Sequence, residues 1–236
     1  MNEAARRRVL ARFGLENLVG VDPVDIAQAH IAHAASLAIP ERFEIEGLTI
    51  DAPAGVYHPR PESSSLMFVR NILALNPPRI RRALEIGCGA GAVALFLAQR
   101  FGADVLATDI APEALAATRA NAALNGVAVR VQASDLFDAV SERGYDLVVF
   151  NVPLVDQAPV SVWDGGTLCD PGGALLSRFA REVGDFLAAG GFALFSLCSN
   201  SAYEHLDGLP LVTRVVGFEM AGAGFWRAVV EGRRAS

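Results

Sequence analysis

The sequence predicts an α/β fold in which a mostly parallel sheet carries helices on both faces. Between residues 82 and 197, short apolar runs typical of buried strands alternate with longer helical patterns, which is the order of βαβ units. The chain then ends in two strand-like runs, joined by the glycine-rich turn 221–224 with no helix between them. A C-terminal antiparallel β-hairpin should therefore extend the parallel sheet.

The elements of this sheet follow from local patterns. Apolar runs and helical spacing predict alternating strands and helices, with strands at 83–86, 104–108, 127–132, 145–151 and 192–197 and helices at 90–101, 112–125 and 173–189. Residues 136–144 are too short for a helix. The expected fold is a Rossmann-like, doubly wound sheet.

Helical patterns also open the chain. Residues 3–13 show a charged amphipathic helix pattern. A second helix should span 22–40, where Asp22 can cap the first turn, Pro23 suits the first helical position and Pro40 ends the segment. The chain therefore begins with a small helical segment.

A hairpin and a third helix should link this segment to the sheet. Apolar alternation on both sides of Gly47 predicts a β-hairpin, and helical spacing from the serine run 63–65 leads to Pro77. We expect residues 1–54 to cover the substrate and residues 55–236 to form the cofactor-binding domain.

Composition limits the kinds of partner. The 236 residues carry a net charge of −6 and only short basic clusters, which argues against nucleic acid as the substrate. Three widely spaced cysteines suit reduced thiols, and no signal pattern or membrane-spanning run is present. We expect a cytoplasmic monomer or homodimer with no membrane partner.

The stretch around residues 85–92 marks a cofactor turn between a strand and a helix. Its glycines satisfy the dinucleotide pattern G-x-G-x-x-A, and Asp109 follows about 20 residues on, so NAD is one candidate. The same residues fit an acid followed by G-x-G-x-G, which suits an amino-acid-bearing adenosine because three positions lack side chains.

Residues after the next two strands favour the second candidate. After the third predicted strand, Asp135 can accept a hydrogen bond from an adenine amine, and Leu136 can pack on the ring. The fourth strand ends in Asn151-Val152-Pro153-Leu154, at the carboxyl edge where such folds build their sites. A nicotinamide enzyme has no use for an Asn-x-Pro step.

Taken together, LEIGCGAG, the acid of ATDIAPEAL, NAALNG, ASDLF and the Asn-x-Pro step resemble the class I S-adenosylmethionine-dependent methyltransferases. The segment GVYHPRPES and the later DGG sequence are similar to those of the release-factor glutamine and adenine-N6 methyltransferases, which carry an Asn-Pro-Pro-Tyr motif. The resemblance implies S-adenosyl-L-methionine as the cofactor and an N-methyltransferase.

The resemblance also implies roles for individual residues. It implies that Asn151 and Pro153 present the acceptor nitrogen, and that no metal takes part. The implied substrate contacts are Tyr57, Leu154, Trp163 and Asp164. The implied cofactor contacts are Arg60, Ser63, Glu85, Gly87, Cys88, Gly89, Gly91, Asp109, Ile110, Asp135, Leu136 and Asn151.

One departure from the motif bears on the acceptor. Leu154 stands where the family has tyrosine, so the aromatic face expected against a planar amide or base is missing, unless Phe150 or Trp163 supplies it. This favours a small amino-acid-like or peptide-like acceptor. Three alternatives remain: a protein-glutamine or nucleic-acid N-methyltransferase, an NAD-dependent oxidoreductase, and a cofactor-binding module without activity.

Overall fold

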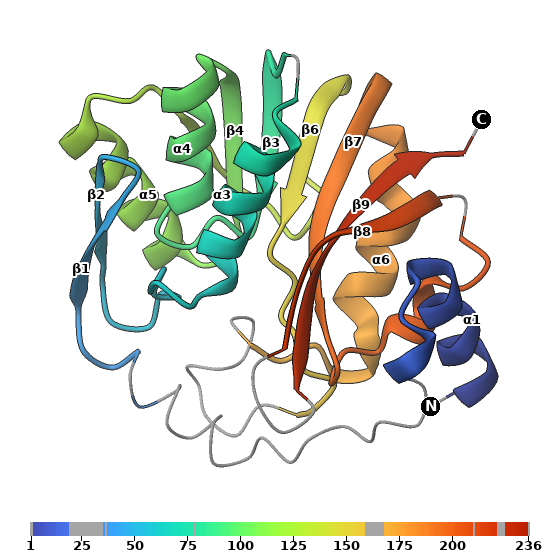
Figure 1. Cartoon of the computed structure of the whole chain (residues 1–236). Helices are drawn as coiled ribbons and strands as arrows, with labels where there is room; N and C mark the ends of the chain where they lie inside the picture. Colours follow the sequence, from blue (N-terminus) through green and yellow to red (C-terminus); the bar gives the residue numbers. More distant parts are fainter. Residues whose placement is uncertain are drawn as a thin grey trace.

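A seven-stranded sheet forms the centre of the protein, in the order β5-β4-β3-β6-β7-β9-β8 (Figure 1). The computed structural model describes residues 2–18, 35, 37–77, 79–158, 168–209, 211–220 and 225–235. The parallel strands are β3 (Arg82–Ile86), β4 (Asp104–Asp109), β5 (Arg130–Ala133), β6 (Tyr145–Phe150) and β7 (Leu187–Cys198). The antiparallel strands β8 (Leu211–Met220) and β9 (Trp226–Arg234) complete the predicted fold, which is confirmed.

Helices cover both faces of this sheet and bury its central strands on both sides. In β6, Leu147 and Val149 pack in one apolar cluster, whereas Val148 and Phe150 pack in the other. The first cluster contains α3 (Ser64–Leu75), α4 (Ala92–Phe101) and α5 (Pro112–Asn125); the second contains α1 (Glu3–Phe13), the 3₁₀ turn η1 (Glu16–Leu18), α6 (Ala174–Glu182) and η4 (Tyr203–Leu206).

The predicted hairpin consists of β1 (Glu41–Ile45) and β2 (Leu48–Ala52), and it is fastened to α5. The Asn121 Oδ1 accepts a hydrogen bond from the Asp51 backbone N–H at 2.9 Å, and the Asn125 Oδ1 accepts one from the Thr49 N–H at 2.8 Å. Two asparagines one helical turn apart thus join the hairpin to the layer of helices.

The predicted helix 173–189 is too long. The segment begins with the 3₁₀ turn η2 (Pro171–Gly173), and α6 then ends at Glu182. A second 3₁₀ turn, η3 (Val183–Asp185), follows, and Leu187 is already part of β7, where it pairs with Tyr145 of β6. A Cβ at Gly191 would lie 2.6 Å from the Tyr145 carbonyl oxygen, so glycine permits this close pairing. Strand β5 is also displaced, starting at Arg130 rather than at residue 127.

Some expectations fall outside the described residues. Most of the predicted helix 22–40 and the turn 221–224 do so, while residues 136–144 contain no helix, as expected. None of the described helices is long and apolar enough to cross a membrane. The division at residue 54 stays a prediction, although α1 packs into the core of the sheet.

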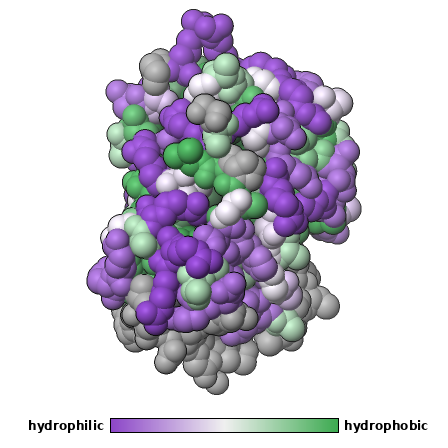
Figure 2. Space-filling view, turned by 90° about the vertical axis from the view of Figure 1, so that its right-hand side faces the viewer, coloured by the Kyte–Doolittle hydropathy of each residue, from purple (hydrophilic) through white to green (hydrophobic). Residues whose placement is uncertain are grey.

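The surface on the side of α1 and the C-terminal strands is mostly hydrophilic, with small apolar areas (Figure 2). Exposed apolar side chains on the edge strand β8 include Val212, Phe218 and Met220, and they alternate with the charged residues Arg214 and Glu219. Single apolar side chains on a surface are ordinary in soluble domains and mark no site by themselves.

Candidate active site

The glycine turn, residues 87–91, follows β3 and starts α4. Gly87, Gly89 and Gly91 all have positive φ, at 64°, 54° and 85°. A Cβ on Gly91 would meet the Thr118 side chain at 2.9 Å. Glycine is therefore required here by backbone conformation and by space, and the turn presents bare backbone at the carboxyl edge of the sheet.

Glu85 fixes the helix that follows the glycine turn. Its side chain is buried, and its Oε2 accepts a hydrogen bond from the Ala94 backbone N–H, in the first turn of α4, at 2.7 Å. Burial raises the pKa of Glu85 well above the usual value of a carboxyl group. The residue thus ties strand to helix beneath the predicted cofactor pocket.

Glu85→Gln should raise the melting temperature of the cofactor-free protein by about 3–6 °C at pH 8 and change it little at pH 4. The carboxyl group ionises in the unfolded chain above about pH 4.3 but resists ionisation when buried, so the wild type loses stability as the pH rises. Calorimetry at both pH values, with the exposed Glu62→Gln as control, measures the difference. An equal gain at both values would contradict this cause.

Asp109 joins the end of β4 to the glycine turn. Its Oδ2 accepts a hydrogen bond from the Gly89 N–H and its Oδ1 one from the Ala111 N–H, both at 2.9 Å, and burial raises its pKa. The next residue, Ile110, is 69% exposed. An acid at this position suits the ribose hydroxyls, the role expected of Asp109, and the contacts of Asp109 and Ile110 with a cofactor stay predictions.

Asp135 and Leu136 make contacts within the protein that the sequence did not predict. Asp135 is exposed, and its Oδ1 accepts a hydrogen bond from the Arg178 Nη1 at 3.1 Å. Leu136 has φ 46° and is 5% exposed, packed in the core. The sequence contained no signal for the Arg178 ion pair, and the roles of both residues toward an adenine remain predictions.

The acceptor motif, residues 151–154, begins where β6 ends. The Ser196 hydroxyl of β7 lies 3.1 Å from the Asn151 Oδ1 and 3.3 Å from the Val152 carbonyl oxygen. Sequence reasoning treated the Ser196 strand as plain core, although a lone hydroxyl in an apolar run was a usable signal. Strand β7 therefore brings a polar group to the predicted transfer site.

Backbone contacts hold the end of the acceptor motif. The Leu154 carbonyl oxygen accepts from the Ser201 Oγ at 2.8 Å and from the Cys198 Sγ at 3.0 Å. The Leu154 side chain is 9% exposed and packs with Val155 and Cys198. The structure shows packing at Leu154, and its contact with an acceptor stays a prediction.

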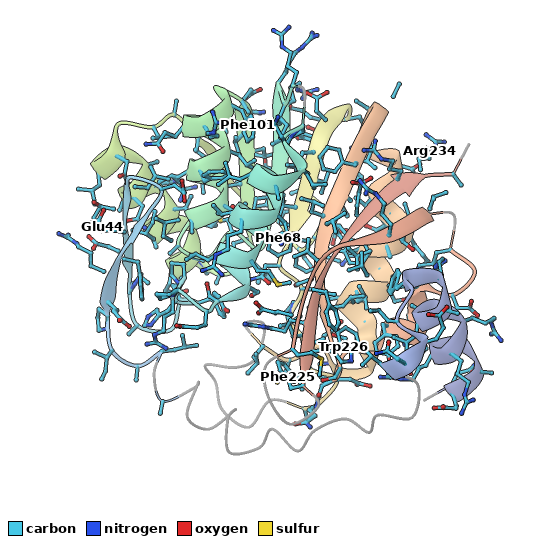
Figure 3. All side chains as sticks on the ribbon, viewed as in Figure 1. Glu44, Phe68, Phe101, Phe225, Trp226 and Arg234 are labelled. Atoms are coloured by element: carbon cyan, nitrogen blue, oxygen red, sulfur yellow. The ribbon has the colours of Figure 1, made fainter. Side chains whose placement is uncertain are left out.

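Aromatic side chains also lie near this edge of the sheet. Phe225 and Trp226 stand at the lower end of β9, which extends beyond the end of β6 (Figure 3), and Phe225 packs against the cluster that contains Leu154. The Phe150 ring is buried between Gly87 and the core, 5.1 Å from the Phe179 ring. Phe225, which the sequence analysis missed, is half-buried and therefore more accessible than Phe150.

The entry segment, residues 55–63, lies against the glycine turn. A Cβ on Gly89 would be 4.0 Å from the Tyr57 Cβ. Arg60 donates to the Glu41 carboxylate at 2.8 Å. Ser63 caps α3 by accepting from the Leu66 N–H at 3.4 Å. Tyr57 thus lies at the glycine turn, whereas the contacts of Arg60 and Ser63 shown here go to β1 and α3, and the cofactor contacts of both residues stay predictions.

Of the remaining predicted site residues, Cys88 lies in the described structure, whereas Trp163 and Asp164 do not. Cys88 is buried, its Sγ lies 3.3 Å from the Thr118 Oγ1, and burial raises its thiol pKa well above normal, so it is a packed side chain.

The chemistry of these groups fits an S-adenosylmethionine-type ligand. Bare backbone at three glycines admits close approach, Asp109 offers carboxylate oxygens and Ile110 offers an exposed apolar face. The turn, the acid and the acceptor motif all come from strands β3, β4 and β6, whose carboxyl ends meet at one edge. That edge is where open α/β sheets bind ligands.

Comparisons with known proteins agree with this geometry. The profile of the methyltransferase small domain matches residues 47–166. A Methanocaldococcus jannaschii protein, provisionally described as a protein N5-glutamine methyltransferase, is 30% identical over 157 residues, which are 63% of this chain and 75% of that protein. The release factor glutamine methyltransferase of Koribacter versatilis is 34% identical over 152 residues, 59% of this chain and 54% of its own.

Two ribosomal RNA enzymes are also similar. The ribosomal RNA small subunit methyltransferase C of Chromohalobacter salexigens is 35% identical over 183 residues, 67% of this chain and 53% of its own. A T. thermophilus 16S rRNA N2 methyltransferase, solved with AdoMet and guanosine, has a TM-score of 0.63 at 18% identity and covers 83% of this chain and 50% of its own.

This chain thus spans about half the length of the last three of these proteins. The matched profile covers β2, the glycine turn, Asp109, Asp135 and the acceptor motif, and the last four are the parts from which the site is built. The chain therefore belongs to the methyltransferase small domain family, the class of S-adenosylmethionine-dependent methyltransferases that its motifs predict.

Proposed function

We propose that the protein methylates the side-chain amide nitrogen of a glutamine in a protein substrate, with a release factor as the first candidate. The observation that carries the proposal is the pair of oxygens at the end of β6. The Asn151 Oδ1 and the Val152 carbonyl oxygen both lie within reach of the one Ser196 hydroxyl, so they are neighbours. A primary amide has two N–H groups that such a pair can accept.

The chain's own residues would align the reaction. S-adenosylmethionine supplies a methyl group activated by a sulfonium. Asp109 and Ile110 would hold the adenosine, while Asn151 and Val152 would turn the amide nitrogen toward the methyl carbon for in-line displacement. Accepting both N–H groups also fixes the direction in which the nitrogen lone pair points, which matters because this nitrogen is a poor nucleophile. In such a transfer the methyl carbon would bond to nitrogen as the C–S bond breaks, S-adenosylhomocysteine would leave, and the nitrogen would pass one proton to solvent.

The relatives support glutamine over the small amino-acid-like molecule that the sequence alone favoured. Named release factor glutamine methyltransferases are 34% and 32% identical over more than 150 residues, and the relatives described above do not support a small-molecule acceptor. Leu154 stands in place of the motif tyrosine, but the half-buried Phe225 packs against the cluster that contains Leu154 and would be the replacement aromatic ring.

Ribosomal RNA is the second candidate acceptor. The relative that is 35% identical over 183 residues is a ribosomal RNA methyltransferase, so the expectation that the composition argues against nucleic acid finds no support in the comparisons. A net charge of −6 still gives the chain little attraction for phosphate backbones. We therefore place protein glutamine first.

Labelled methyl transfer separates the two acceptors. The purified protein is incubated with methyl-tritiated S-adenosylmethionine and either unmodified release factor or unmodified small ribosomal subunits. The proposal predicts label in the release factor and background counts in the RNA. Label in RNA alone would replace it by the second candidate, and label in neither would favour a module without activity.

A further inference from the structure

Ser196 is a buried hydroxyl inside a strand that is otherwise apolar. It is 2% exposed, and its neighbours Phe195 and Leu197 are fully buried. The backbone of Ser196 pairs with Val229 of β9, while the strand's other side pairs with β6. A hydroxyl in such a place needs a hydrogen-bond partner because its burial is otherwise costly.

Both partners of this hydroxyl belong to the acceptor motif. The Oγ lies 3.1 Å from the Asn151 Oδ1 and 3.3 Å from the Val152 carbonyl oxygen. A hydroxyl has one proton, so it can saturate only one of these oxygens at a time. Lone pairs on both oxygens therefore stay available to a second donor from the pocket side.

Without this hydroxyl, the orientation of the carboxamide would be poorly defined. The terminal torsion of asparagine joins an sp³ to an sp² carbon and has broad, roughly two-fold minima, so the side chain alone does not choose a setting. The contact to Ser196 chooses one, and it does so from β7, a strand whose register with β6 is fixed by Phe150 and Phe195.

We propose that Ser196 is a positioning residue for methyl transfer, holding the Asn151 carboxamide beside the Val152 carbonyl so that the two oxygens receive one nitrogen. The inference rests on the proposed function, since it gives those oxygens an N–H donor. It adds a residue that acts through Asn151 and from a different strand.

Ser196→Ala is a mild change that isolates the contact. It removes one oxygen atom from a small side chain, and the folded protein should keep its melting temperature to within about 3 °C. Ser196→Thr keeps the hydroxyl and suits a strand. Thr213→Val is the matched control, because the Thr213 Oγ1 is buried in the neighbouring sheet region and has no hydrogen-bond partner among the described residues.

A pair of cofactor analogues tests the alignment without any acceptor. Sinefungin has an amine-bearing carbon in place of the methylsulfonium, so its N–H groups should point at the two oxygens. S-adenosylhomocysteine has no donor there. Calorimetric titration of both ligands gives the affinity for sinefungin divided by the affinity for S-adenosylhomocysteine. This affinity ratio reports on the two oxygens alone, and a general loss of stability would not change it.

We expect Ser196→Ala to weaken sinefungin about 5–10-fold while leaving S-adenosylhomocysteine within about 2-fold, the loss of one hydrogen bond's alignment. Ser196→Thr should restore the ratio, Thr213→Val should not alter it and Asn151→Ala should lower it. A ratio lowered by Asn151→Ala but unchanged by Ser196→Ala would overturn the role of Ser196 alone. A ratio unchanged in both variants would overturn it together with the proposed role of Asn151.

Discussion

Asn151→Ala is expected to lower kcat for methyl transfer by about 100-fold to 1,000-fold, the range seen when one oriented partner of a reacting group is removed. The Asn151 Oδ1 lies at the end of β6 beside the Val152 carbonyl oxygen, and both are needed to fix the two N–H groups of the amide. The variant should still bind S-adenosylhomocysteine with an affinity close to that of the wild type.

Initial rates with labelled cofactor and calorimetric titration of S-adenosylhomocysteine check both parts of this prediction. Asn71→Ala is a suitable control, because Asn71 donates to the Met67 carbonyl oxygen on α3 and lies away from the acceptor motif. Equal rates for Asn151→Ala and wild type would show that the site does not work as described.

Arg6→Met is expected to lower the free energy of unfolding by about 3–5 kcal/mol, the usual cost of removing one partner of a buried ion pair. Arg6 lies 2.9 Å from the Glu204 carboxylate, with both side chains 9% exposed. Its guanidinium also donates to the Ser201 and Ser199 carbonyl oxygens at 3.1 and 3.2 Å and covers the Tyr203 ring at 3.8 Å. The change would leave Glu204 charged and buried.

The neighbouring Arg7→Met provides the control. Arg7 pairs with Glu3 on the same helix, but both side chains are about 60% exposed, so the loss should be within about 0.5 kcal/mol. Urea unfolding compares the variants, and Arg6→Met/Glu204→Leu should recover part of the loss by removing the stranded charge. Arg6 and Arg7 variants of equal stability would refute the importance of the buried pair.

The elements that could be predicted are those encoded locally. From residue 82 onward, apolar periodicity predicts most of the strands and helices. Three closely spaced glycines predict the turn, and all three have positive φ in the structure. Asp109 could be placed because it ends β4, one strand from the turn, and its contact with Gly89 spans neighbouring elements. A short stretch of sequence is enough to predict such elements, because the interactions that form them lie within or next to that stretch.

The contacts that could not be predicted join residues far apart in the chain. Arg6 meets the segment 199–204 across nearly the whole sequence, and Ser196 meets Asn151 because β7 happens to pair with β6. Arg178 likewise binds Asp135 from α6. The sequence around either partner does not predict these contacts, because the residues come together only when the sheet has formed.

One structural consequence links the N-terminal helix to the site. The Ser201 backbone carbonyl oxygen accepts from Arg6, while the Ser201 hydroxyl donates to the Leu154 carbonyl oxygen. The sequence predicted a cover for the substrate from this part of the chain. The described contacts give α1 a further task, since it supports the segment that holds the acceptor motif.

The most direct test of the account is to locate the transferred methyl group by fragmentation mass spectrometry of release factor treated with the protein and S-adenosylmethionine. The account predicts a gain of one methyl on the side-chain amide nitrogen of a single glutamine, absent with Asn151→Ala. A methyl group on an oxygen, on a carbon or on an arginine nitrogen would contradict the assignment of Asn151 and Val152 as the oxygens that receive an amide.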